Sequence, residues 1–427
     1  MLRVLLITRE PWRDDSNEGS VLSSWFENQP MELANIYCKP GNPENHCCKK
    51  YFQLTDKMAA KNLLRGEEMG AVFDLSEAVE EEASQNQTEK EKKAFYDFFR
   101  RNNWASFFLA RECLWGLAKW KSKALEDFVD GFAPDVIVAP LCYCSYVMRI
   151  QRWVAKRLQK PLVGIVWDDI YSFKQWHFSP IYWLNRLIYR RGVKKTVDDC
   201  AALYTLCPQQ AEGFSGLFKR TIGVFPKVGL PAVPTQLSDE CIRFIYAGGI
   251  YNGRMPTLLM IRDKLAELNQ NGFPCRLDVY TNSPDVQVLE KEGVCQVHAA
   301  VRADELKKLY GASNVALQVE GFDRKAELQY RYSFSSKIVD CLSSGCAVLA
   351  ICPKQNTGYQ YLKAENSALC VDELEQLPSA VETMVKDGQL RTALAKRAEE
   401  CVCANHDPAK VKACVLEELR KVAMIQE

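Results

Sequence analysis

Several features that would assign this 427-residue sequence to other protein classes are missing. No apolar run is long enough to span a bilayer. Residues 1–8 contain only a short apolar run before charged residues follow, so we expect a first strand there rather than a signal peptide. The net charge is only +1, which leaves no global field to attract nucleic acid, and any anion site must be local. These absences predict a cytoplasmic protein, or one bound at the inner face of the membrane.

Motifs for metals and dinucleotides are missing as well. The loop after the first strand does not read GxGxxG. The eighteen cysteines are scattered, and the pairs Cys47-Cys48, Cys142/Cys144 and Cys401/Cys403 lack the CxxC spacing of zinc sites. Free cysteine in an apolar run packs as a small hydrophobic residue, and thiols stay reduced without export. We therefore expect reduced thiols, no metal and no cofactor.

What is present is the composition of a soluble globular protein, 47% hydrophobic and 26% charged. The chain is too long for one ordinary core, which predicts two domains. Residues 226–240 are rich in proline and show little periodicity, so they form the best candidate linker. The expected parts are a domain over 1–230, a linker over 231–240, a second domain over 241–405 and a terminal helix over 406–427.

In the first half, polar side chains follow two predicted strands. A loop containing Asp14 and Gly19 follows the strand at 3–8, and the apolar run 161–167 delivers Asp168 and Asp169 at its end. Ligands of open α/β sheets bind at the carboxyl ends of strands, where a carboxylate can act as a base or a hydrogen-bond acceptor. A solvated loop with a helix N-cap explains the same residues, and both interpretations stay open.

Two further segments of the first half have two interpretations each. Aromatic residues recur at helical spacing over 94–129, which is typical of a long helix, or two, packed on the sheet. Residues 171–195 combine aromatic and basic side chains, and this suits either the interface of an anionic membrane or an amphipathic helix on a domain core. The charged run at 80–93 indicates a solvated loop or helix start.

The second half begins with a new α/β unit. The strand 242–247 runs into Gly248-Gly249, and Arg254 lies just before a helix predicted over 256–271. Glycines let backbone approach a ligand closely, and an arginine can bind phosphate through two hydrogen bonds. A later strand, 315–319, ends at Glu320.

The most informative stretch is 335–345, which we interpret as a capped helix that stops at Gly345 and leads into a buried strand at 346–351. Ser335, Ser336 and Lys337 open the helix, where backbone N–H groups and the helix dipole favour anions. Asp340 lies one turn further on. This combination predicts a diphosphate at the start of the helix, with a sugar hydroxyl beside Asp340.

The alternation of strands and helices about a proline-rich middle suits two doubly wound domains facing a cleft. The second half resembles the nucleotide-sugar domain of GT-B glycosyltransferases, near the group 1 (family 4) enzymes of bacterial polysaccharide assembly. The resemblance rests on 247–254, 335–349 and 361–366, and more loosely on 166–169 and 199–207. It implies an α/β chain of two Rossmann-like domains, with the C-terminal helix crossing back to the first domain.

The resemblance also implies roles for single residues. Arg254 stands where the family has a basic residue on the donor diphosphate, and Ser335, Ser336 and Lys337 stand at the helix start that receives it. Asp340 matches the second glutamate of the family's E-x7-E motif, which binds the nucleotide ribose.

Three positions depart from the family pattern. The first acid of E-x7-E falls on Tyr332, so that contact is missing or displaced to Glu320 or Glu327. Gly249 replaces an arginine. Trp167 replaces a common histidine and leaves Asp168 as the matching acid.

The expected reaction transfers a sugar from a nucleotide-diphosphate-sugar to a glycan or lipid-linked acceptor. Lys337, Arg254 and the helix start would neutralise the leaving diphosphate without a metal, so the absence of a DxD motif does not count against it. The family favours retention, whereas inversion would need Asp168, Asp169 or Asp14 as base. The alternatives are a sugar-nucleotide epimerase and a catalytically silent nucleotide-sugar-binding or scaffold protein of the same fold.

Overall fold

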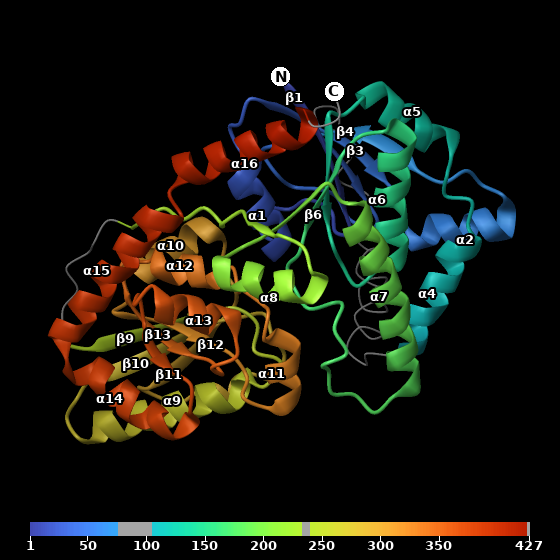
Figure 1. The fold of residues 1–427 in the computed structure, drawn as a ribbon. Coiled ribbons are helices and arrows are strands. Elements are labelled where there is room, and N and C mark those ends of the chain that lie inside the picture. The colour runs from blue at the N-terminus through green and yellow to red at the C-terminus, as the bar shows by residue number, and fades with distance from the viewer. Residues whose placement is uncertain (76–104, 233–239, 425–427) are drawn as a thin grey trace.

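The computed structural model describes residues 1–75, 105–232 and 240–424 (Figure 1). Two mostly parallel sheets, each with helices packed against it, form two domains that lie side by side. This is the doubly wound two-domain architecture that the alternation predicts. The first sheet uses strands from residues 2–224 and the second uses strands from residues 242–371, while 233–239, within the predicted linker, fall outside the described residues. The predicted domain boundaries stay predictions.

The first sheet has the order β4-β3-β2-β1-β5-β6-β7-β8, and β3 with β4 is its antiparallel pair. Strand order reverses between β1 and β5, whose registers align Val4 with Val136. Its strands are β1 (Leu2–Thr8), β2 (Met31–Tyr37), β3 (Lys50–Gln53), β4 (Ala71–Asp74), β5 (Val136–Pro140), β6 (Leu162–Ile165), β7 (Ala202–Thr205) and β8 (Gly223–Val224). Its helices are α1 (Asn17–Phe26), α2 (Asp56–Arg65), α4 (Ala105–Leu117), α5 (Lys123–Phe132), α6 (Ser145–Leu158), α7 (Pro180–Asp199) and α8 (Pro208–Phe218).

The second sheet has the order β11-β10-β9-β12-β13-β14 and is parallel throughout. Its strands are β9 (Ile242–Ala247), β10 (Cys275–Tyr280), β11 (Cys295–His298), β12 (Val315–Val319), β13 (Ala347–Ile351) and β14 (Leu369–Val371). Its helices are α9 (Arg254–Gln270), α10 (Ala303–Gly311), α11 (Arg324–Tyr330), α12 (Lys337–Leu342), α13 (Thr357–Ala364), α14 (Leu377–Lys386) and α15 (Gly388–Asn405). The buried apolar runs predicted as strands, such as 315–319, form the core of this sheet because both faces are covered by helices.

The terminal helix α16 (Pro408–Met424) crosses back to the first domain, as predicted. It packs against α1 and β5, and Figure 1 shows it directly over α1. The Tyr204 hydroxyl donates to Glu418 over 2.8 Å, and the Gln29 amide donates to the Lys412 carbonyl oxygen over 2.6 Å. Helix α16 therefore belongs to the first domain in space, although it follows the second in sequence.

The two places where the chain crosses between the domains are bonded to each other. His406 Nδ1 lies 2.8 Å from the Lys227 carbonyl oxygen, and the Gly229 N–H donates to the His406 carbonyl oxygen over 2.9 Å. The other ring nitrogen of His406 lies 2.8 Å from the Tyr361 hydroxyl, inside the second domain. His406 thus connects both crossings to each other and to the second domain.

The aromatic segment 94–129 contains two helices, α4 and α5, which is one of its two predicted forms. Residues 94–104 and the charged run 80–93 lie outside the described residues. Other segments differ from their predicted form. Residues 171–179 are irregular and lead into α7. A helix, α11, occupies the insertion interpreted as merely polar and tyrosine-rich. The sequence analysis also missed α2, β3, β4 and α8.

All eighteen cysteines are free. Within the described chain, no three His, Cys, Asp or Glu side chains gather closely enough to hold a metal ion. None of the helices in residues 1–75, 105–232 and 240–424 is long and apolar enough to cross a membrane.

Candidate functional site

The turn between β9 and α9 forms one wall of the candidate site. Gly248 has φ +139°, which an L side chain rarely adopts, and a Cβ there would lie 2.5 Å from Lys337 Nζ. Arg254 reaches back from the start of α9 and donates from Nη1 to the Gly249 carbonyl oxygen over 3.1 Å. The two cations predicted for the donor diphosphate therefore lie at the two ends of the same Gly248–Gly249 turn.

Arg254 is held in place by Glu320 at the end of β12. Its Nη2 and Nε lie 2.6 and 3.1 Å from the same carboxylate oxygen, and Arg254 and Glu320 are 7% and 5% exposed. Gln318 donates to the other oxygen of Glu320 over 3.0 Å. Burial lowers the pKa of Arg254, but the charge of Glu320 outweighs it and the net shift is upward, so the guanidinium stays charged. Glu320 supports the cation from behind.

Lys337 is placed by Tyr246 on β9. Its Nζ lies 3.4 Å from the Tyr246 hydroxyl and 4.9 Å from the centre of that ring. The hydroxyl itself donates to the Gly249 carbonyl oxygen over 2.8 Å. The tyrosine thus links the lysine to the glycine turn.

The predicted capped helix at 335–345 is corrected by the structure. Helix α12 spans only Lys337–Leu342, and its N-cap Ser336 is in the αR region with no side-chain cap bond. The Ser335 carbonyl oxygen accepts from the Ile338 N–H, so the backbone itself closes the first turn. A helix of six residues has a small dipole, and the charge at this site comes mainly from Lys337 and Arg254. Gly345 has φ +78° and turns the chain into β13.

Asp340, predicted for the ribose, is paired with the first crossing segment. Its carboxylate lies 2.6 Å from Lys227 Nζ, which also donates to the Ser336 carbonyl oxygen over 3.2 Å. The Asp340 side chain remains 42% exposed, so it can still accept from a ligand. The sequence analysis did not single out Lys227, because its partner lies 113 residues away.

Tyr332, at the position of the first acid of E-x7-E, points into the first domain. Its ring lies 5.3 Å from that of Phe214 on α8, and its carbonyl oxygen accepts from Gln210 Nε2 over 2.7 Å. The missing acid is therefore replaced by a contact between domains. Of the two suggested substitutes, Glu320 lies at the site behind Arg254, whereas Glu327 lies on α11.

Asp168 and Asp169 follow β6 and face different surroundings. Asp168 is half-buried; burial raises its pKa, a hydrogen bond with Ser333 opposes this, and the charges of Asp169 and Glu320 add to the rise. The Asp168 carboxylate thus lies close to residues of the second domain. Asp169 is buried beneath it and binds Arg186 and Arg331 at 3.3 and 2.5 Å. Asp169 also accepts from the Ser172 hydroxyl over 2.5 Å and from the Tyr171 and Ser172 N–H groups.

The remaining predicted acceptor-side residues lie around α1. Gly19 is required locally, since a Cβ there would fall 2.0 Å from the Arg13 carbonyl oxygen. Asp14 accepts from the Ser23 hydroxyl and lines a cavity of about 380 Å³. The cavity is walled by residues of the loop after β1, helix α1 and its end, the loop after β2, the segment 228–230 and α16: Asp14, Ser20, Ser23, Ser24, Glu27, His46, Cys47, Val228, Leu230, Pro408 and Lys412. Asp14 therefore lies where α1 meets the crossing segment and α16.

Trp167 stacks on Trp25 of α1, with ring centres 5.6 Å apart and planes 13° from parallel. Its carbonyl oxygen accepts from Gln210 Nε2 over 2.6 Å, and its indole Nε1 is buried without a partner. The stack joins the chain just before Asp168 to α1. Gln210, which binds Trp167 and Tyr332 together, was missed from sequence; a polar residue one turn into a helix after β7 carries no distinctive signal.

Comparisons with known proteins bear on the family and the fold. The family model described as glycosyl transferase-like matches residues 261–416, from α9 into α16. No curated protein matches the chain. Among solved structures, sucrose-phosphate synthase from Thermosynechococcus elongatus is similar over 99% of both chains, with a TM-score of 0.60 and 13% identity.

Two other solved structures are similar at a TM-score of 0.58. One is the α,α-trehalose-phosphate synthase (UDP-forming) of Burkholderia xenovorans in complex with glucose-6-phosphate, with 8% identity over 98% of this chain and 100% of that one. The other is Anabaena Alr3699/HepE in complex with UDP, with 12% identity over 99% of this chain and 100% of that one. At these identities the likeness is one of fold.

Proposed function

We propose that this chain, which has the GT-B fold of glycosyltransferases and a glycosyl transferase-like domain over 261–416, moves a sugar from a nucleotide-diphosphate-sugar to a glycan or lipid-linked acceptor. The observation that carries the proposal is the placement of Lys337 and Arg254 at the two ends of the Gly248–Gly249 turn. A complex of a similar structure with UDP supports a nucleoside diphosphate as the product.

The two cations act on the charge that develops during transfer. As the bond between the anomeric carbon and the diphosphate oxygen breaks, negative charge grows on the leaving diphosphate, and preorganised cations stabilise it most at the transition state. Glu320 and Tyr246 hold the two cations before the donor arrives. In this proposal, Ser335, Ser336 and the glycine turn border the diphosphate, and Asp340 accepts from the ribose. No metal is required for this chemistry.

The acceptor oxygen forms the new bond to the anomeric carbon and loses its proton. We propose retention, in which the departing diphosphate oxygen takes that proton. For inversion, Asp168 is the better-placed base, because its raised pKa marks a carboxyl that can hold a proton, whereas Asp169 is occupied by two arginines. Product stereochemistry measured by NMR distinguishes the two, and an inverted product would overturn retention.

The setting that we propose is cell-surface polysaccharide synthesis at the cytoplasmic face of a membrane. Residues 171–195 support a peripheral contact, because Phe173, Trp176 and Phe178 are exposed near the exposed Lys174. Sedimentation with anionic vesicles tests this contact, and equal binding by a Trp176→Ala, Phe178→Ala variant would contradict it.

A thermal-shift screen tests the donor site directly. A nucleoside diphosphate, or its sugar, that binds the native state should raise the melting temperature. Lys337→Ala should abolish that shift and lower sugar transfer by about 100-fold, since one preorganised donor is worth about that much. Lys386→Ala, on the distant α14, is the matched control. We choose Lys337 over Arg254 because removing Arg254 would leave Glu320 buried without its partner.

Two observations favour a second candidate, a silent nucleotide-sugar-binding or scaffold protein. Tyr332 replaces an acid, and Asp340 is already paired with Lys227. This candidate predicts a thermal shift with no consumption of any sugar donor. Donor consumption without an added acceptor, yielding an altered nucleotide-sugar, would instead indicate an epimerase.

A further inference from the structure

The segment 330–333 carries the closest polar contact between the domains away from the crossings. Arg331 extends from the end of α11 into the first domain, where its Nη2 lies 2.5 Å from Asp169 Oδ2 and 2.6 Å from the Ser172 hydroxyl. The side chains of Arg331 and Asp169 are 11% and 0% exposed. A buried pair of this kind has one strongly preferred geometry, because Arg331 withdrawn from Asp169 would be a desolvated guanidinium without its carboxylate.

The segment is anchored equally firmly in its own domain. The Arg331 carbonyl oxygen accepts from the Thr357 N–H and hydroxyl over 2.9 and 2.7 Å. The Asn356 amide donates to the Tyr330 carbonyl oxygen over 2.8 Å. Since Asn356 and Thr357 begin α13, Arg331 connects a helix of the second domain rigidly to the first.

Tyr332 makes a second contact beside the ion pair. Its ring packs on Phe214, and a Cβ added to Gly213 of α8 would lie 2.7 Å from its Cε1. The first domain therefore approaches the ring so closely that only a glycine fits there.

These contacts surround Asp168. Asp169, which Arg331 holds, is its neighbour in sequence, and Ser333, two residues beyond Arg331, lies near enough to Asp168 to lower its pKa. We propose that Arg331 is a positioning residue that fixes the angle between the domains and so places Asp168 and the acceptor side over the donor site. This inference rests on the proposed transfer reaction. It assigns a role to the segment that replaces the first acid of the family motif.

Two independent variants test the inference. Arg331→Ala removes the ion pair. Gly213→Ala, in the first domain, adds a methyl group that pushes away the Tyr332 ring of the second domain and leaves the Arg331 side chain unchanged. Their matched controls are Lys325→Ala, an exposed cation on α11, and Gly216→Ala on α8, where a Cβ would meet nothing within 4 Å. Both test variants should lower kcat by about 10- to 100-fold, since a misplacement of about 1 Å has effects of that size.

The measurement that separates positioning from general damage is donor affinity. Arg254, Glu320 and Lys337 all lie in the second domain, so both test variants should bind the nucleoside diphosphate within about twofold of wild type. Arg331→Lys, which keeps a cation for Asp169, should recover much of kcat. Small-angle scattering should report a changed radius of gyration for Arg331→Ala but not for Arg331→Lys.

Several outcomes would overturn the inference. These are an unchanged kcat in Arg331→Ala, a loss of donor affinity equal to the loss of kcat, or no rescue by lysine. If the wild-type protein consumes no sugar donor, the proposed function fails instead. The scattering comparison still decides in that case whether Arg331 sets the angle between the domains.

Discussion

Glu18, in the first turn of α1, is a carboxyl that the fold disfavours in its charged form. Its Oε1 is buried and has no hydrogen-bond partner. Burial raises its pKa to about 7, the nearby Glu10 adds to the rise, and Arg9 and Lys39 oppose it. In the unfolded chain the same group ionises near pH 4.5. Between these values the native state holds more protons than the unfolded state, so Glu18 reduces stability as the pH rises through this window.

We therefore expect Glu18→Gln to stabilise the protein at pH 8 and to have little effect at pH 4. The gain at pH 8 should reach about 3 kcal/mol, because each unit of pKa shift corresponds to about 1.4 kcal/mol. Urea unfolding of the wild type and of Glu18→Gln at the two pH values measures this difference in the free energy of unfolding. A difference between variant and wild type that stays constant with pH would contradict the assignment.

Single residues also show what the sequence could and could not indicate. Lys337 and Arg254 could be placed at one sheet edge, since each follows a strand of the same parallel sheet. The pairing of Asp340 with Lys227 and of Arg331 with Asp169 could not be predicted, because the partners are 113 and 162 residues apart in the sequence. Tyr332 was marked as a departure, but its contact with α8 depends on how the domains meet.

At the scale of elements, the β9–α9 turn and the start of α11 are fitted to each other. Gly253 has φ +79°, and a Cβ there would lie 2.2 Å from Asp323 Oδ2. Asp323 caps α11 by accepting from the Ala326 N–H over 3.0 Å. A side chain at Gly253 would therefore disturb the cap as well as strain the turn.

Gly253→Ala should lower the free energy of unfolding by about 2 kcal/mol, combining the cost of the left-handed conformation with the loss of the cap. Gly272→Ala is the matched control, because it has φ +82° but a Cβ there would meet nothing within 4 Å. It should cost about 1 kcal/mol. Chemical denaturation of the two variants measures the difference, and equal losses would show that the fit to Asp323 has no energetic weight.

The elements that sequence predicted best are those with strong burial. Strand β12 has the predicted bounds, 315–319, since a continuous apolar run of this length allows one arrangement. Strand β4 was missed because it is short and only partly buried. The cap of α12 was wrong because a serine hydroxyl caps a helix when the backbone of that serine is extended, and Ser336 is in the αR region.

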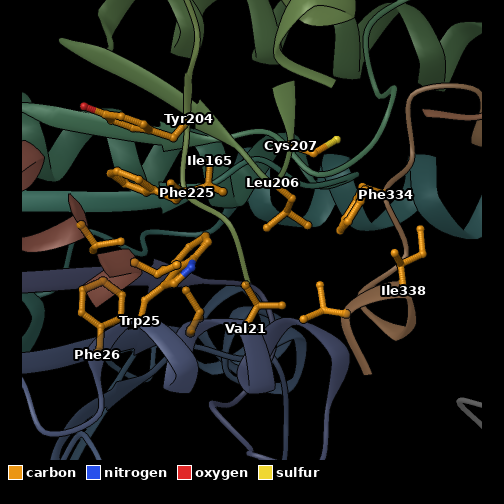
Figure 2. Packing of buried hydrophobic residues seen from close by; sticks show 14 of the residues in the cluster. Val21, Trp25, Phe26, Ile165, Tyr204, Leu206, Cys207, Phe225, Phe334 and Ile338 are labelled. Atoms are coloured by element: carbon orange, nitrogen blue, oxygen red, sulfur yellow. The ribbon is translucent and has the colours of Figure 1, made fainter. Parts of the chain in front are cut away.

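Over the whole molecule, one hydrophobic cluster continues from the first domain into the second. Figure 2 shows Phe334 and Ile338 of the second domain approaching Leu206 and Cys207 of the first, within the cluster that also holds Trp25. Phe334 is buried and meets Tyr361 edge-on, with ring centres 5.2 Å apart. Together with the hydrogen bonds of His406 that join the two crossings, this shared core should make the two domains unfold as one unit.

Phe334→Ala should therefore lower the stability of both domains together, by about 3 to 5 kcal/mol, the usual cost of emptying a buried phenylalanine site. Scanning calorimetry should record one transition at a lower temperature. Phe273→Ala, at an exposed phenylalanine of the second domain, is the control and should change the melting temperature little. Two separated transitions in the wild-type protein would contradict a shared core.

The buried thiols give the molecule a set of internal reporters. Eleven of its eighteen free cysteines are buried, and they are spread over both domains from Cys38 to Cys401. A short pulse of an alkylating reagent can mark such a thiol only when the structure around it opens. Mass spectrometry of the marked peptides would then yield an opening free energy at each position, with no engineered label.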